Sequence, residues 1–113
     1  MAVQACHECL SWMIPLLDPF PRVRRFTLGE RIETLALAIL EALVEASFSR
    51  QDKGAWLDRA NRKLAVLRHL WRLCYELRVI SMRRYEHGAR LFDELGRQIG
   101  GWRKAVRQKK ESA

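Results

Sequence analysis

Cys6 and Cys9, which flank His7 and Glu8, are the residues whose types and spacing could hold a metal ion or carry redox chemistry. A structural zinc site needs four ligands, so a Cys-x-x-Cys pair requires a second ligand pair elsewhere. The third cysteine and the other two histidines are not spaced as such a pair. Cys6 also falls on a stripe of apolar residues, where a free thiol packs as a small hydrophobe. We therefore expect structural thiols without metal or cofactor; a small metal or thiol protein is the weaker alternative.

Catalytic motifs are absent from the sequence. It has no glycine-rich phosphate loop, His-Glu-x-x-His helix or nucleophile elbow. Acidic residues at helical spacing, such as Glu41 and Glu45, are better explained as solvated faces or partners of arginines. The longest apolar run, residues 35–40, is too short to span a bilayer, and no secretory signal precedes the three cysteines. We predict a cytoplasmic protein that is not an enzyme and has no membrane partner.

Basic residues carry more information than the cysteines. The chain of 113 residues has a formal net charge of +8, and such a surface favours polyanions. Arg83, Arg90, Arg97 and Lys104 recur every seven positions. On an unbroken helix they would form a basic ridge about 30 Å long, which could follow a phosphate backbone.

Local ion pairing is the alternative explanation of this ridge, because Glu86 precedes Arg90, and Asp93 precedes Arg97, by four residues. A second basic cluster near the N-terminus and the basic C-terminal tail favour polyanion contact. The candidate nucleic-acid-binding residues are Arg83, Arg90, Arg97, Lys104, Arg22, Arg24, Arg25 and Arg107. No groove-reading motif or aromatic interleaving accompanies them, so we expect RNA and DNA to bind without sequence specificity.

Four heptad-spaced apolar stripes predict the helices that position these residues. The expected helices cover residues 3–17, residues from between Pro21 and Thr27 to the polar connection 49–54, residues 56–79, and a last helix that follows an N-cap at Ser81. Pro15 should kink the first helix. The very short last connection makes its two helices antiparallel neighbours. We predict an all-α, up-down antiparallel four-helix bundle, with residues 1–113 as a single domain and a basic tail at about 103–113.

A second apolar stripe lies on the third and fourth predicted helices, roughly 100° from the first stripe. Its members are Val66, Leu70, Leu73, Leu77, Leu91, Leu95 and Trp102. One core cannot cover both faces, so we interpret this stripe as the interface of a homo-oligomer. The alternative is that these residues only widen the face that the core covers.

Residues 20–33, Phe-Pro-Arg-Val-Arg-Arg-Phe-Thr-Leu-Gly-Glu-Arg-Ile-Glu, resemble the signature of the accessory variability determinant family of diversity-generating retroelements. Segments 43–47, 60–64 and 95–102 continue the likeness in the expected order. The resemblance covers nearly the whole chain after the first few residues. Related four-helix proteins encoded in ribosomal-RNA intervening sequences share the fold and part of the Phe-Pro-Arg region.

This resemblance implies a four-helix bundle that assembles into a homopentameric barrel and has no active site of its own. Members of the family bind nucleic acid, both template RNA and cDNA, and the reverse transcriptase of the same retroelement. They support mutagenic retrohoming, in which error-prone cDNA replaces part of a target gene. The alternative function, suggested by the intervening-sequence relatives, is a self-associating basic bundle that binds structured RNA without a polymerase partner.

Overall fold

The computed structural model describes residues 1–112, so Ala113, the last residue of the expected basic tail, lies outside the described residues. Four long helices dominate it: α1 (Ala2–Met13), α3 (Glu30–Phe48), α4 (Lys53–Glu76) and α5 (Met82–Ser112). Shorter segments are the 3-10 helix η1 (Ile14–Leu17), the single turn α2 (Arg22–Arg24) and the π-helical turn η2 (Arg25–Gly29). Residues 1–112 contain no strand, which confirms the all-α class.

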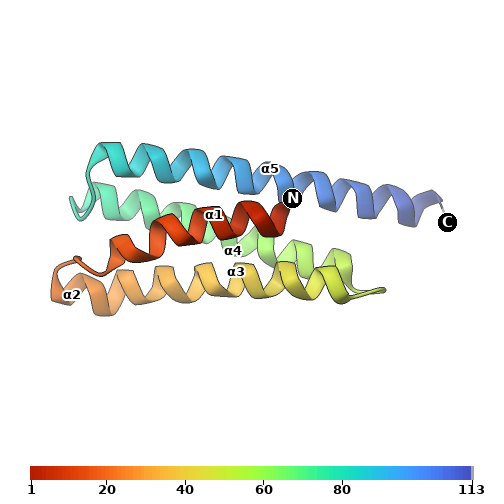
Figure 1. The fold of residues 1–113 in the computed structure, drawn as a ribbon, viewed down its shortest axis with the longest axis horizontal. Helices are drawn as coiled ribbons and strands as arrows, with labels where there is room; N and C mark the ends of the chain where they lie inside the picture. Colours follow the sequence, from red (N-terminus) through yellow and green to blue (C-terminus); the bar gives the residue numbers. More distant parts are fainter. Residues whose placement is uncertain (113) are drawn as a thin grey trace.

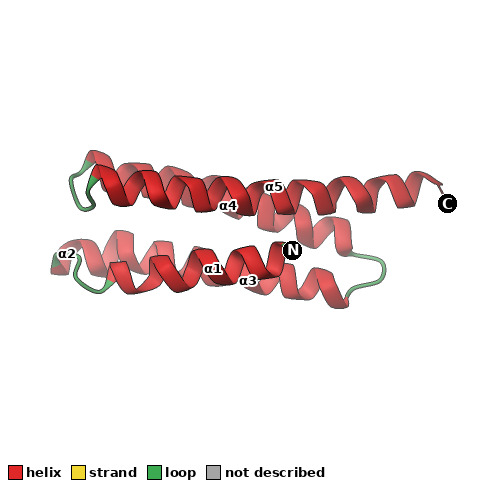
Figure 2. Ribbon diagram, turned by 45° about the horizontal axis from the view of Figure 1, so that its top comes forward, coloured by secondary structure: helices red, strands yellow, loops and turns green. Residues whose placement is uncertain are grey.

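The helices form a rod of 52 × 22 × 19 Å in which consecutive long helices run antiparallel (Figures 1 and 2). α3 packs against α4, α4 against α5, and α1 against both α5 and α3. The grooves between α1 and α5 and between α3 and α4 therefore lie on opposite sides of the bundle. No helix within the described part of the chain is long and apolar enough to cross a membrane.

Proline and hydroxyl residues set the helix boundaries. α1 ends at Met13 and continues as a 3-10 turn that contains Pro15, as expected for a residue that cannot donate a backbone hydrogen bond. Helical structure resumes after Pro21. Thr27 lies inside it, and its hydroxyl donates to the carbonyl oxygen of Val23, four residues earlier, at 2.7 Å. The expected N-cap at Ser81 is confirmed: its Oγ accepts the backbone N–H of Arg84 at 3.2 Å.

The first apolar stripe predicted for residues 56–79 lies on α4 and faces the core along the whole length of this helix. Its buried residues are Leu57, Ala60, Leu64, Leu67, Trp71 and Cys74. Trp71 is the largest fully buried side chain. Its ring packs edge-on against Trp12 and Phe92, with ring centroids 5.9 and 6.1 Å apart, and its Nε1–H donates to the carbonyl oxygen of Tyr85 at 3.2 Å. Trp71 thus joins α1, α4 and α5 at one point of the core.

The sequence prediction for α5 was wrong for Leu95. This residue, expected on the second apolar stripe, is fully buried, whereas the apolar side chain of Met82 at the start of the helix is 56% exposed. Leu95 lies three residues after buried Phe92 and four before buried Ile99, so these three share one helix face. On this helix the second stripe widens the core face, as the alternative interpretation holds.

The expected basic tail is helical over the part that the structure describes. Gly100 and Gly101 lie within α5, and residues 103–112 continue the same helix. Val106 still packs partly against the core. Beyond the bundle, the last turns of α5 extend past the other helices (Figure 1).

Candidate nucleic-acid interface

The basic ridge of Arg83, Arg90, Arg97 and Lys104 lies on one uninterrupted helix. α5 runs unbroken from Met82 to Ser112, and all four ridge side chains are exposed. The ridge therefore has the continuous length of about 30 Å that its spacing implied.

The ion pairs around this ridge differ from those expected from helical spacing. Asp93 accepts from Arg68 of α4 at 2.6 Å, while Arg97 pairs with Glu94. Among the described residues, neither Glu86 nor Arg90 has an ion-pair partner. Asp93 therefore pairs with an arginine of another helix in place of Arg97, and the expected pair of Glu86 with Arg90 does not form. Within the described ridge, only Arg97 is partly neutralised.

A surface hollow of about 430 Å³ lies between α1 and the first turns of α5, and we call it the α1/α5 hollow. It is lined by Trp12, Arg83, Arg84, His87 and Arg90. Its lining contains three guanidinium groups and no carboxylate. Positions 83, 84, 87 and 90 share a face because they are spaced by helical steps of three and four. Such a site can bind phosphate, since each guanidinium offers a planar fork of donors to two oxygens.

Two aromatic rings close one side of the α1/α5 hollow, and the sequence alone did not indicate this. The rings of Trp12 and His87 are 4.5 Å apart, and Trp12 in turn contacts Trp71. The spacing of the basic residues could have revealed their common face. Trp12 comes from α1, at the other end of the sequence, so only the tertiary fold reveals its place beside them.

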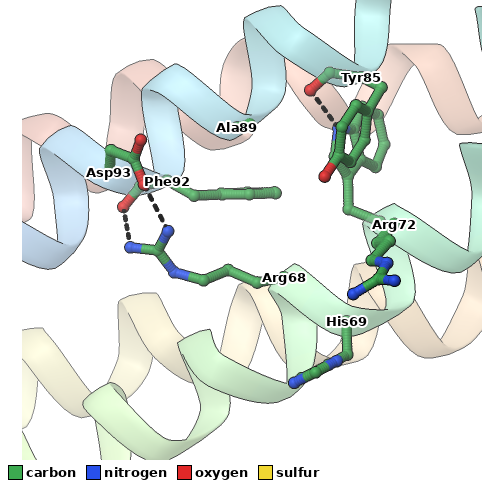
Figure 3. A pocket seen from close by; sticks show the side chains of 8 residues that line it. Arg68, His69, Arg72, Tyr85, Ala89, Phe92 and Asp93 are labelled. Atoms are coloured by element: carbon green, nitrogen blue, oxygen red, sulfur yellow. Dashed lines mark hydrogen bonds and ion pairs between the residues drawn. The ribbon is translucent and has the colours of Figure 1, made fainter. Parts of the chain in front are cut away.

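A second hollow, between α4 and α5, contains basic residues that are already compensated (Figure 3). Arg68 donates to the Asp93 carboxylate at 2.6 Å and to the carbonyl oxygen of Phe92 at 2.9 Å. Arg72 pairs with Glu76 at 3.6 Å. The ring of Phe92 lies between the Arg68 contacts and the Trp71–Tyr85 hydrogen bond (Figure 3). Phosphate would have to displace these carboxylates, so this hollow is a poorer anion site than the α1/α5 hollow.

The remaining candidate nucleic-acid residues do not form one surface. Arg25 is held between Asp18 and Glu33, at 3.9 and 3.5 Å, and is therefore neutralised within the fold. Arg22 and Arg24 lie on α2, at the end of the bundle where α5 begins (Figure 1). Arg107 lies towards the opposite end, on the extended part of α5. Only the residues near the start of α5 are brought together in one hollow.

The candidate oligomer interface is exposed on α4. Val66, Leu73 and Leu77 are 46%, 37% and 43% exposed, whereas Leu70 between them is half-buried against the core. On α5, Leu91 and Trp102 also pack partly against the core. A further exposed apolar set lies on α3, outside the predicted stripe, and consists of Leu37, Val44 and Phe48. The α4 residues are thus the part of the predicted interface that the fold leaves uncovered.

Cys6, Cys9 and Cys74 are free thiols that pack inside the core, as expected for Cys6 from its place on the apolar stripe. Burial raises the pKa of Cys6 and Cys9 to about 12 and that of Cys74 to about 11. The neighbouring Cys6 adds to the rise for Cys9. Such thiols stay protonated at neutral pH and are poor nucleophiles. Within residues 1–112, no three His, Cys, Asp or Glu residues are grouped so as to hold a metal ion.

Comparison with known protein families gives a match over most of the chain. A family described as bAvd-like matches residues 1–106, which include α1, α3, α4, α5 as far as Val106, and the α1/α5 hollow. No curated protein matches the sequence. The matched range includes the segment at residues 20–33 that resembles the accessory variability determinant signature. The chain therefore belongs to the bAvd-like family of accessory variability determinants.

Proposed function

We propose that this protein is a non-enzymatic accessory subunit of a diversity-generating retroelement, which binds the reverse transcriptase and nucleic acid to support mutagenic retrohoming. The observation that carries the proposal is the family match over residues 1–106. Its members are accessory proteins that carry no catalytic centre. The proposal accordingly assigns no catalytic residue and no cofactor to this chain.

The nucleic-acid part of the proposal is supported by the α1/α5 hollow and the ridge that continues from it. Arg83, Arg84 and Arg90 surround the hollow, and no described carboxylate pairs with them. Template RNA and cDNA are both polyanions, and binding releases the cations condensed on their phosphates. A site made of arginines on a helix face can therefore bind either one without reading its bases.

Self-association is supported by the exposed apolar residues of α4. Val66, Leu73 and Leu77 lie on one side of a helix whose other side is already covered by the core. The number of copies, five, comes from the family resemblance. A ring would bring several ridges together, and contacts made through linked copies raise the overall affinity without new chemistry.

The proposal is tested by co-expressing the tagged protein with the reverse transcriptase encoded beside it. We expect the polymerase to co-purify, and deletion of the accessory gene to abolish transfer of template sequence into the variable repeat. A deletion strain that retrohomes normally would refute the proposal. A reverse-transcriptase gene next to near-identical template and variable repeats is the expected genomic setting.

The alternative function is a self-associating basic bundle that binds structured RNA without a polymerase. The α1/α5 hollow and the exposed apolar residues of α4 are equally consistent with this alternative, because RNA binding and self-association do not require a polymerase. It would be favoured if RNA co-purified with the protein while the neighbouring polymerase did not.

A further inference from the structure

A third basic hollow, of about 230 Å³, lies between α3 and α4, and we call it the α3/α4 hollow. It is lined by Arg31, Leu35, Arg59, Arg62, Lys63 and Val66. Four of these six residues are cationic and none is acidic. Arg31 comes from α3 and the other three cations from two successive turns of α4, so only the packing of these helices brings them together.

The four cations of this hollow have no acidic partner among the described residues. By contrast, Arg68 of α4 pairs with Asp93 of α5, and Arg103 of α5 pairs with Asp58 of α4 at 2.8 Å. The guanidinium of Arg59 instead lies over the ring of Trp56, with its Cζ 4.6 Å from the centroid. A cation–π contact leaves the positive charge uncancelled. The hollow therefore carries four positive charges that the fold does not compensate.

The lining of the hollow combines charged and apolar residues. Leu35 is buried, and Val66 is partly exposed. Apolar surface lowers the local dielectric constant, so an anion bound in the hollow interacts more strongly with the cations than it would in open water. A concave site of this kind is better suited to an anion than four cations on a convex surface.

The α3/α4 hollow is on the opposite side of the bundle from the α1/α5 hollow. α1 contacts α5 and α3, while α4 contacts α3 and α5, so the two grooves do not share a helix. The body of the bundle, 19 to 22 Å across, separates them. A strand bound in one groove therefore leaves the other open.

We propose that the α3/α4 hollow is a second phosphate-binding site for nucleic acid, so that one chain holds two nucleic-acid segments on opposite faces. This inference rests on the nucleic-acid binding proposed above. Through its two sites the accessory subunit would hold two polyanionic segments on either side of the bundle, although these segments repel one another when free.

An acidic surface of a second copy is the competing occupant, because Val66 also belongs to the proposed oligomer interface. On α3, the exposed carboxylates Glu30, Glu41 and Glu45 are spread over about four turns. Those carboxylates are too widely spaced for three of them to reach one hollow. A nucleic-acid strand supplies one negative charge per nucleotide, which matches closely placed cations better.

The test compares Arg59→Gln/Arg62→Gln with a matched control, Arg50→Gln/Arg78→Gln. Both variants lose two exposed positive charges, but Arg50 and Arg78 lie in the connections outside the hollows. Binding of fluorescein-labelled oligouridylate is followed in a salt titration. Each phosphate contact on a single strand contributes about 0.7 to the log–log salt slope, so the hollow variant should flatten it by about 1.4 relative to the control. The parent should also bind two oligonucleotides per chain, and the variant one.

Three results would overturn the inference. A hollow variant that binds with the slope and stoichiometry of the control shows that the cations are only solvated. A variant that binds RNA normally but has a lower mass by light scattering shows that the hollow is a contact between copies. A parent protein that does not bind the probe even at low salt removes the proposed nucleic-acid function as well. Arg31→Gln, on the other helix, repeats the test should the double variant fail to fold.

Discussion

The backbone of Gly88 on α5 lies directly against the indole ring of Trp71 on α4. A methyl group at position 88 would overlap the indole Nε1 and lie 2.8 Å from its Cε2. The ring has little room to withdraw, because it contacts Trp12 and Phe92 and donates to the carbonyl oxygen of Tyr85. The close approach of α4 and α5 therefore depends on the missing side chain at position 88.

Gly88→Ala should destabilise the protein by about 1–3 kcal/mol, the usual cost of overpacking a core. The substitution also gains roughly 1 kcal/mol of helix propensity, so the clash must exceed that gain. Gly100→Ala is the matched control, because nothing lies within 4 Å of a methyl group there and the same gain should stabilise the helix. Urea denaturation of both variants measures the difference. Equal stabilisation by the two substitutions would contradict the packing argument.

The pair Arg68 and Asp93 joins α4 to α5 at the surface, with side chains 39% and 72% exposed. Solvent screens such a pair, so we expect Asp93→Asn to cost no more than about 1 kcal/mol. Arg68→Met should cost somewhat more, because it also removes the hydrogen bond to the carbonyl oxygen of Phe92 at 2.9 Å. A double-mutant cycle in low and high salt isolates the coupling. Coupling that does not weaken with salt would contradict the surface-pair interpretation.

Much of this fold could be predicted from the sequence, because heptad spacing reports directly which side of a helix is covered. The α4 seam from Leu57 to Cys74 is buried as the spacing predicted. On α5, a second apolar stripe lies about 100° from the first, and spacing alone did not decide which of the two the core covers. The structure buries Leu95 and exposes Met82, since α5 turns Phe92, Leu95 and Ile99 to the core.

The candidate site was only partly predictable for a related reason. For residues on one helix, such as Arg83 and Arg90, the spacing in the sequence predicts that they share a face. The contact between Trp12 and His87, and the presence of Arg31 and Arg59 in one hollow, are relationships between helices, which depend on how the helices pack. The ion pairs also depend on contacts between helices. Helical spacing made Arg97 the favourable local partner of Asp93, yet Asp93 pairs with Arg68 of α4.

Leu73→Glu should dissociate the proposed oligomer without unfolding the bundle. Leu73 is 37% exposed, so a carboxylate there remains hydrated in the isolated chain but loses its hydration in an apolar contact. Leu70→Glu should dissociate the oligomer too, but with a loss of stability, because Leu70 packs partly against the core. Light scattering and circular dichroism separate the two effects. Leu73→Met, which keeps the apolar contact, is the control and should assemble like the parent.

The buried thiols should make stability depend on pH in the alkaline range. The pKa of Cys6 and Cys9 is about 12 in the folded protein, above the ordinary value of 9.0 that we expect after unfolding. Between these values the folded chain binds more protons than the unfolded chain, so the free energy of unfolding falls as pH rises. The contribution of these two thiols to the free energy of unfolding should be fully retained below pH 9 and should decline towards pH 12. Urea denaturation under reducing conditions should show a flatter decline for Cys6→Ala/Cys9→Ala.

Nucleic-acid binding through the α5 ridge should be electrostatic and almost indifferent to base sequence. The arginines of the α1/α5 hollow can bond phosphate, while the rings of Trp12 and His87 already pack against each other, 4.5 Å apart. Affinities for oligouridylate and oligoadenylate should therefore lie within a few-fold of each other, and both should fall steeply with salt. Replacing Arg83, Arg90, Arg97 and Lys104 with Gln should weaken binding to both and flatten the salt slope. The fold should survive, because all four side chains are exposed. A variant that binds as tightly as the parent at every salt concentration would show that the ridge is only a solvated face. A strong preference of the parent for one homopolymer would instead show that bases are stacked or read.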